Sequence, residues 1–291
     1  MAKTIWYSQP LAEIWEAYHK KNKKKTLTPK EFIYEWVLPE VSNPFMKDPT
    51  PGQTAILISE MFFLDTEKKL LHLFFMEKDL RDFLIELPVK DFNGLIQTVI
   101  DKGTEVVSGI LSSRGDNIST GQKTSRLDFG IHIPYENKFK GYAFSFHFDE
   151  QNKLVFVWLV GNNAGFIPVE KYNDLIKDES EDSKLICRYF QLAVNTVIYM
   201  NTFPNCVVDG APPIMKFDYA HRIELDEKIS NIIENSKTRG VVAPHFRRAY
   251  FKRLSSDFYT HKKGQTILVS ETTVNGKAKT VYTASDLEKI E

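Results

Sequence analysis

The sequence predicts an α+β fold with a helical N-terminal part, an antiparallel β-meander, a buried central helix and a C-terminal basic segment with a β-hairpin. Residues 184–201 are apolar around most of a helical circumference, which is typical of a helix inside a core. Three successive runs, 127–133, 141–148 and 153–160, have the alternating or wholly apolar pattern of strands. Near the C-terminus, Asn275-Gly276 is the strongest short signal of a hairpin turn.

The N-terminal part of the chain predicts helices. Residues 4–38 have apolar positions at helical spacing on both sides of a basic loop at 19–26, which indicates two helices. Thr28 begins the second helix, and Glu31 lies three residues later to complete a capping box. The apolar segment 54–76 predicts a further helix, in preference to two pieces divided at its central polar residues.

The segments around the meander are less regular. A short helix or strand is expected over 79–86 and a helix over 92–100. Residues 112–125 are rich in Gly, Ser and Thr and predict a mobile polar loop. Residues 149–152 predict the turn of an antiparallel hairpin between the last two strands. The acidic run 178–182 is expected to be a solvated loop or the first turn of the central helix, where carboxylates favour the helix N-terminus.

After the central helix the chain predicts smaller elements. Residues 204–213 predict a proline-rich crossing, and 226–235 predict a short surface helix. The basic, aromatic segment 243–253 precedes the hairpin, whose expected strands are 265–274 and 278–283.

Composition is that of a globular protein, since 42% of the 291 residues are hydrophobic. We expect two domains, a helical region over 1–80 and an α+β domain over 81–291. Cys187 and Cys206 form no CxxC pair, which predicts two buried, reduced thiols. The sequence shows no signal peptide and no apolar stretch of membrane-spanning length, so we expect a cytoplasmic protein without a membrane partner.

The charge of the chain is unevenly distributed although the formal net charge is zero. Residues 1–30 contain seven Lys and two Glu, and residues 237–265 contain eight Lys or Arg and one Asp. Basic ends indicate an anionic partner, nucleic acid first. The alternative is that these ends are solvated and have no binding role.

One group of titratable residues suggests catalysis. Asp128 and His132 share the polar face of a predicted strand, and His147 lies on the next strand. Such a group predicts general acid–base chemistry, or else the ordinary polar face of a half-exposed sheet. The sequence has no HExxH or CxxC metal motif, no phosphate-binding loop and no GxSxG elbow, so we expect no metal and no cofactor.

The basic segment 243–253 offers a second chemistry, because it interleaves cations with flat rings. Guanidinium groups bind phosphates, and rings stack on unpaired bases, so the pattern favours single-stranded RNA. The alternative is structural, with the rings as core anchors and the cations exposed beside them. The predicted nucleic-acid or partner-binding residues are His245, Phe246, Arg247, Arg248, Tyr250, Phe251 and Arg253.

The order of these segments resembles the phage- and plasmid-borne family of the second type V-A anti-CRISPR protein. The resemblance covers roughly residues 85–285 and ends in a C-terminal Pro-His-x-Arg-Arg-Gly-His-aromatic motif. Four residues match that motif, namely Pro244, His245, Arg247 and Arg248. Ala249 stands where the family has Gly, and Tyr250 stands where it has the second His. The segments that carry the resemblance are LPVKDF (87–92), SRLDFGIHIP (125–134), GYAFSFHFDEQNKLVFVWLV (141–160), GFIPVEKYNDL (165–175), LICRYFQLAVNTVIYM (185–200) and APHFRRAYFKR (243–253).

The resemblance implies a non-catalytic anti-defence protein that acts in the cytoplasm of a bacterial host cell. Such a protein recognises the nascent N-terminal peptide of a CRISPR effector nuclease on its translating ribosome and provokes loss of the nuclease mRNA. Its partners would be that peptide, the ribosome and its message, with single-stranded RNA as a further partner. Two alternatives stay open: an RNA-binding nuclease or hydrolase that uses Asp128, His132 and His147, or a regulatory protein with a protein partner only.

Overall fold

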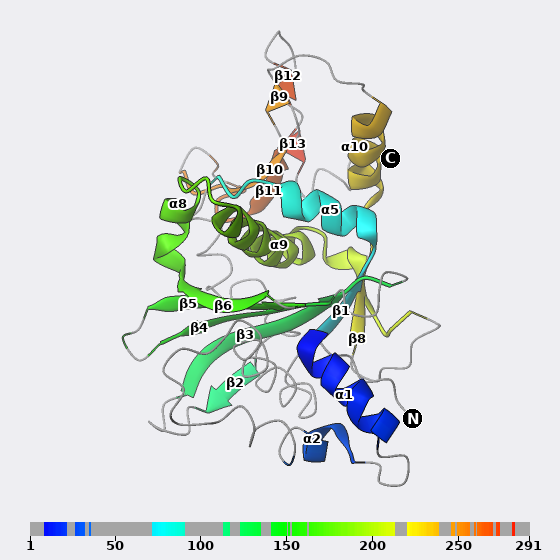
Figure 1. Ribbon diagram of the computed structural model, residues 1–291. Coiled ribbons are helices and arrows are strands. Elements are labelled where there is room, and N and C mark those ends of the chain that lie inside the picture. The colour runs from blue at the N-terminus through cyan, green and yellow to red at the C-terminus, as the bar shows by residue number, and fades with distance from the viewer. Residues whose placement is uncertain are drawn as a thin grey trace. The chain divides into compact units, whose positions relative to one another are not determined.

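The structure is a computed structural model that describes residues 9–21, 27–32, 35, 72–90, 113–116, 123–134, 141–149, 151, 153–161, 163–212, 220–238, 246–247, 249–256, 259, 261–269, 272–273 and 281–282. The chain has an α+β fold, which confirms the predicted class (Figure 1). Within the described part, no helix is both long enough and apolar enough to span a bilayer.

The chain divides into two compact units, each made of three segments. The first contains Met1–Met76, Leu111–Asn173 and Asp209–Arg222, and the second contains the remaining residues. The predicted domains, 1–80 and 81–291, stay a prediction.

The first unit begins with helices α1 (Gln9–Lys21) and α2 (Pro29–Phe32). The predicted capping box is confirmed, because the backbone N–H of Thr28 donates to Glu31 Oε2 at 2.7 Å and the N–H of Glu31 donates to Thr28 Oγ1 at 3.3 Å. The buried Phe32 ring contacts the rings of Trp15 and Tyr18, with centroids 4.9 and 5.5 Å apart. The short second helix is thereby attached to the first by aromatic packing.

The main sheet has eight strands, in the order β6-β5-β4-β3-β1-β8-β7, and β2 pairs with β3 beside this path. Strands β3 to β6 form an antiparallel meander, and β1 is parallel to β3. The predicted hairpin turn is confirmed, since Asp149 Oδ1 accepts from the N–H groups of Gln151 and Lys153 at 2.9 and 2.8 Å. The strands are β1 (His72–Met76), β2 (Ser113–Asp116), β3 (Lys123–His132), β4 (Gly141–Phe148), β5 (Leu154–Val160), β6 (Asn163–Pro168), β7 (Val207–Asp209) and β8 (Ala220–Ile223).

Two predicted elements need correction. The helix expected over 54–76 is wrong at its end, because residues 72–76 form β1. Four consecutive apolar residues of β1 are buried, as in a parallel strand that is covered on both faces. The loop expected over 112–125 is also wrong in part, since β2 and the first residues of β3 pair there as antiparallel strands. Backbone pairing needs no apolar side chain, so composition gave no sign of it. The expected helix over 92–100 lies outside the described residues.

One face of the main sheet carries a row of aromatic rings that crosses five strands, and all of them are buried except His221, which is partly exposed. Neighbouring ring centroids lie 5.5 to 6.4 Å apart, within the range of favourable aromatic pairs. The aromatic side chains of β4 are buried except for Phe148, which is partly exposed. We call this row the aromatic ladder; its members in order are His221, Phe74, Phe129, Phe144, Phe156 and Trp158.

Trp158 of β5, the last ring of the aromatic ladder, contacts two residues of β6. Trp158 Nε1 donates to Asn163 Oδ1 at 2.6 Å. The indole also lies over Gly165, where a Cβ atom would come within 2.7 Å of the ring carbon Cζ2. Glycine is therefore required by packing at this position of the strand.

Replacing Gly165 by alanine is expected to displace the Trp158 indole and to lower the free energy of unfolding by about 1–3 kcal/mol, the usual cost of overpacking. Urea denaturation measures this change. Ala164→Ser, at the preceding position of the same strand, is the control and is expected to unfold like the parent. Unchanged stability of Gly165→Ala would show that the indole does not hold this position.

The second unit is built on α9 (Glu181–Thr202), which confirms the predicted central helix. The Ser180 side chain caps it by accepting from the N–H of Ser183 at 3.2 Å. Helix α5 (Lys78–Glu86), predicted as a helix or strand, lies beside α9 (Figure 1). Asn195 is buried on α9 and donates through Nδ2 to the carbonyl oxygens of Leu84 and Leu87, both at 2.9 Å.

The chain after α9 completes the second unit. The predicted surface helix is confirmed as α10 (Glu227–Thr238). The expected crossing contains a 3-10 helix (Pro204–Cys206) and β7. In the tail, β10 (Tyr250–Arg253), β11 (Thr266–Val269) and β13 (Val281–Tyr282) form a small antiparallel sheet, and β9 (Phe246–Arg247) pairs with β12 (Thr272–Thr273). The antiparallel pairing of β11 with β13 confirms the two strands of the predicted hairpin, whereas its turn lies outside the described residues.

Candidate nucleic-acid interface

The basic aromatic tail folds as strand β10 with two different faces. Tyr250 and Lys252 share one face, because they pair with Val269 and Ile267 of β11 while Phe251 points the other way. Tyr250 is half-buried and packs against an apolar cluster of Leu254, Ile267 and Val269. Its ring is therefore held in place by the small sheet.

The opposite face of β10 is structural. Phe251 is 0% exposed, which makes it a core anchor, as the structural alternative expected for this ring. Ala249, which stands where the resembling family has glycine, is 2% exposed. Arg253 is only partly exposed. Of the predicted tail residues in β10, Tyr250 is the ring that remains at the surface.

Lys90 belongs to this surface although the sequence gave no reason to place it there. Its Nζ atom lies 4.4 Å from the centroid of the Tyr250 ring, a cation–π contact worth about 0.5–1 kcal/mol at an exposed site. Lys90 is exposed and follows the C-terminal end of α5. Only the fold of the second unit brings it to the tail, so local sequence patterns carry no signal of the contact.

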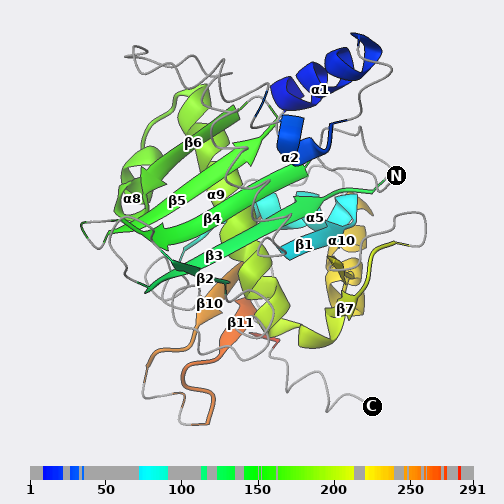
Figure 2. The same ribbon diagram turned by 90° about the horizontal axis from the view of Figure 1, so that it is seen from below.

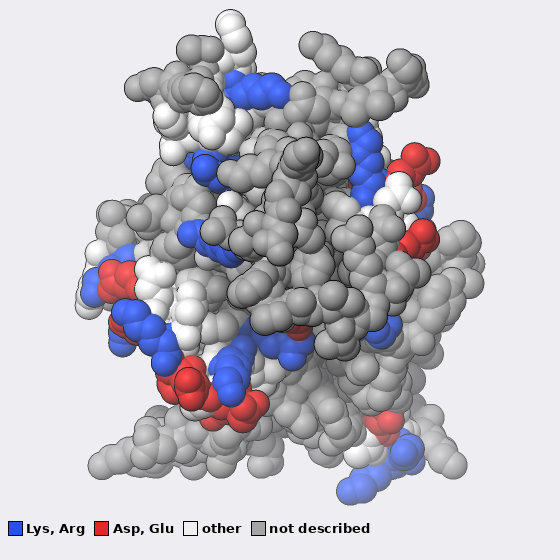
Figure 3. Space-filling view, turned by 90° about the horizontal axis from the view of Figure 1, so that it is seen from above, with Lys and Arg blue, Asp and Glu red and all other residues white. Residues whose placement is uncertain are grey.

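Further cations lie in the turn between β10 and β11. This turn is fixed by hydrogen bonds from Gly264 N–H to Leu254 O at 2.7 Å and from Leu254 N–H to Gln265 O at 2.8 Å, and Gly264 has a positive φ of 88°. The described residues between 249 and 269 include four Lys or Arg and no carboxylate. Figure 3 shows that several Lys and Arg side chains lie at the surface on the face that it draws. We call Lys90, Tyr250, Lys252, Lys262 and Lys263 the tail surface.

The rest of the predicted tail motif is only partly described. His245 and Arg248 lie outside the described residues. Phe246 and Arg247 form β9, where their backbones pair with Thr273 and Thr272. Their predicted contacts with nucleic acid or a partner stay a prediction.

The candidate catalytic residues lie on the main sheet, in the first unit. Asp128 and His132 are 2% and 6% exposed, so the face expected to be half-exposed is closed over them. Four residues along a strand span about 13 Å, so their side chains do not meet. His132 instead packs edge-on against Phe75, with centroids 5.6 Å apart.

His147 has a closer polar neighbour that the sequence analysis did not single out. Its Nδ1 atom lies 3.3 Å from Ser145 Oγ. Ser145 is paired with Asp128 across the neighbouring strands β4 and β3. A hydroxyl beside an imidazole is the pair used in nucleophilic catalysis. Ser145 is fully buried, however, so no substrate reaches its oxygen in this structure. Among the described side chains, no group of three His, Cys, Asp or Glu is placed to hold a metal ion.

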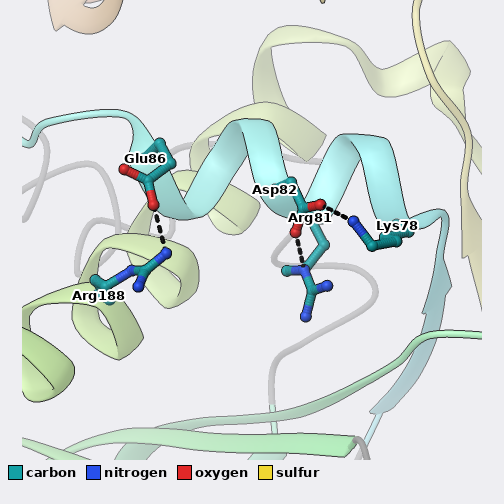
Figure 4. Close-up of polar contacts among 5 residues, drawn as sticks. All are labelled: Lys78, Arg81, Asp82, Glu86 and Arg188. Atoms are coloured by element: carbon teal, nitrogen blue, oxygen red, sulfur yellow. Dashed lines mark hydrogen bonds and ion pairs between the residues drawn. The ribbon is translucent and has the colours of Figure 1, made fainter. Parts of the chain in front are cut away.

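A groove of about 590 Å³ lies beside the N-terminal end of α9 and is lined by four carboxylates and two cations. Arg188 contacts Glu86 at 2.5 Å, while Lys78 and Arg81 contact Asp82 at the other end of α5 (Figure 4). The groove residues that carry charge are Glu86, Asp178, Glu181, Asp182, Lys184 and Arg188.

Local contacts neutralise much of that charge. Lys184 contacts Glu181 at 2.8 Å. Asp178 accepts hydrogen bonds from the N–H and the hydroxyl of Ser180 and from the hydroxyl of Ser183, and these bonds lower the pKa of its carboxyl. The polar side chains that line the groove thus contact one another in the network that starts α9.

Both cysteines are free. Burial, and then the charge of Asp178, raises the pKa of Cys187, and burial raises the pKa of Cys206. Both thiols therefore remain protonated near neutral pH, which is unsuited to nucleophilic catalysis. Cys187 is buried as predicted, whereas Cys206 is only half-buried.

Comparison of the chain with protein-family models, with curated proteins and with solved structures gives no match in any of the three. The resemblance to the anti-CRISPR family therefore stays a prediction that rests on the residues quoted above.

Proposed function

We propose that the chain is a non-catalytic anti-defence protein of a mobile element that acts in the cytoplasm of a bacterial host. It suppresses production of a CRISPR effector nuclease by recognising the nascent N-terminal peptide and provoking loss of the mRNA. The target, a CRISPR effector nuclease, is inferred from the family resemblance. RNA binding is inferred from the cations and the tyrosine ring of the tail surface. The buried positions of Asp128 and His132 favour this proposal over the hydrolase alternative.

The tail surface has the chemistry that an RNA backbone requires. Lysine ammonium groups bind phosphates as point charges and release condensed counterions, which provides sequence-independent affinity. Lys90 over Tyr250 and the sheet residue Lys252 come from segments far apart in the chain and add to the turn lysines. The small sheet holds the backbone of Lys252, and the contact with Tyr250 positions Lys90, which lowers the entropy cost of ordering these two side chains when RNA binds.

The decisive experiment measures nuclease message in a bacterial host that carries a type V-A system. The parent chain is expected to lower the message, and the triple variant Lys252→Glu, Lys262→Glu, Lys263→Glu is expected to leave it near the level found without the chain. The matched control reverses the same number of lysines elsewhere, at the exposed positions Lys78, Lys177 and Lys184, and should behave as the parent. A parent chain that leaves the message unchanged would overturn the proposed function.

RNA binding is tested separately with the purified chain and a labelled single-stranded RNA. Affinity should fall linearly with the logarithm of salt concentration, and each lost phosphate contact should reduce the slope by about 1. The triple tail variant should therefore bind more weakly with a smaller slope, while the control triple variant keeps both values. Cleavage of the RNA, with or without divalent metal ions, would support the hydrolase alternative instead.

A further inference from the structure

Strand β6 (Asn163–Pro168) is the last strand of the main sheet and pairs with β5 alone among the described strands. It lies at the margin of the sheet in Figure 2. None of its six residues is buried, whereas the five central residues of β5 all are. Phe166 is 68% exposed and is one of two large hydrophobic residues exposed in the described part of the chain.

The composition of β6 lacks the usual protection of an edge. Natural edge strands carry lysine, inward-pointing charges or bulges that prevent pairing with another chain. Residues 163–168 (NAGFIP) contain no charged side chain, and their register with β5 is continuous. Proline occurs only at the end of the strand, where it interrupts little of the outer backbone.

The edge is also preformed. The hydrogen bond of Trp158 to Asn163 and the packing of the indole over Gly165 fix β6 on β5. A fixed template lowers the ordering cost of binding, so backbone hydrogen bonds made along it contribute more to affinity. Just beyond the end of β6, Glu170 Oε1 lies 3.7 Å from Lys153 Nζ, which precedes β5.

We infer that the outer edge of β6 binds an extended peptide, which joins the sheet as an added strand with an apolar side chain against Phe166. Main-chain hydrogen bonds to the outward N–H and C=O groups give affinity in this mode, and alternate side chains give specificity. Phe166, Ala164 and Pro168 share one face, so the peptide is expected to place every second residue, apolar in character, beside them. The inference rests on the proposed function, for which it supplies the site of peptide recognition.

The dimensions of the edge favour a peptide over a second copy of the chain. Six residues span about 20 Å, and one added strand of this length buries far less than the roughly 1,200–2,000 Å² typical of stable protein interfaces. An extended peptide makes its backbone hydrogen bonds along the edge itself and needs no larger interface, and a nascent chain is such a segment. We therefore commit to a peptide of about six to eight residues as the occupant.

The test begins with selection of a random eight-residue peptide library on the immobilised full chain. The enriched peptide is labelled, and its affinity is measured by fluorescence anisotropy. Phe166→Ser is expected to weaken binding at least about tenfold, because the apolar contact is lost, while Phe166→Leu retains most of it. Ile176→Ser removes the other exposed large hydrophobic residue and should leave affinity unchanged.

Methylation of single peptide amides then tests the added strand directly. Alternate amides donate to the edge, so methylation should abolish binding at every second position and have little effect between them.

Failure to enrich any peptide, or an even response to methylation, would overturn the inference. A chain that sediments as a dimer, with Phe166→Ser monomeric, would overturn it in favour of a second copy. The message assay in the host reports on the proposed function separately, so peptide binding at the edge with unchanged message would overturn that function alone.

Discussion

Replacing Asn195 by leucine is expected to lower the free energy of unfolding by about 2–4 kcal/mol, because two buried carbonyl groups lose their donor. The Asn195 amide donates to Leu84 O and Leu87 O at 2.9 Å, at the end of α5 where the helix leaves carbonyl oxygens without internal partners. Leucine has nearly the same shape, so the change isolates the hydrogen bonds from the packing. Urea denaturation monitored by circular dichroism measures the difference.

Asn201 provides the matched control for this substitution on the same helix. Its Nδ2 donates to Val197 O at 2.8 Å, four residues earlier, but the side chain is only half-buried and water can replace it. Asn201→Leu should therefore cost less than about 1 kcal/mol. Equal losses for the two variants would contradict the view that Asn195 joins α5 to α9.

Removing the Tyr199 hydroxyl is the second large effect that we expect. The oxygen donates to Glu224 O at 2.9 Å and accepts from Asp226 N–H at 2.8 Å, so it joins α9 to the start of α10. Burial, and then the nearby Cys206, raises the pKa of Tyr199 far above its usual value, which keeps the hydroxyl protonated as a donor. Tyr199→Phe should reduce the free energy of unfolding by about 1–3 kcal/mol.

Hydrogen exchange separates a local from a general effect of Tyr199→Phe. Asp226 accepts the N–H of Lys228 at 3.0 Å and so forms the cap of α10. Amides in the first turn of α10 should exchange faster in the variant, beyond the change common to the whole chain, while amides of β4 show only that common change. Uniform acceleration throughout would mean that the hydroxyl has no special role at the α10 start.

The sequence predicted those elements whose pattern has a single interpretation. The central helix is apolar on nearly every side over 18 residues, and no strand has that length. Residues 72–76 are apolar in a short run, which suits either a buried strand or a buried helix, and the helix preference was wrong there. The polar strand β2 was predicted as part of a loop, because its pairing depends on backbone groups that every residue has.

The candidate sites show the same limit. Periodicity correctly put Asp128 and His132 on one face of a strand, but only the folded sheet shows that this face is closed. The contact of Lys90 with Tyr250 joins segments that nothing in the sequence relates. The open edge of β6 follows from strand order, which local patterns do not specify. Residue types were thus predictable, whereas burial and partners were not.

The aromatic ladder sets an order in which the first unit can assemble. Strands β3 to β6 are consecutive and antiparallel, so short loop closures suffice to bring four of the rings together. Phe74 and His221 come from the strands before and after that meander, across much longer stretches of chain. During synthesis the meander emerges more than fifty residues before His221, and until then β1, which pairs with β3, is the edge of the sheet on the side where β8 later pairs. The main sheet of the first unit is therefore completed late in synthesis, when β8 pairs with strands that have already formed.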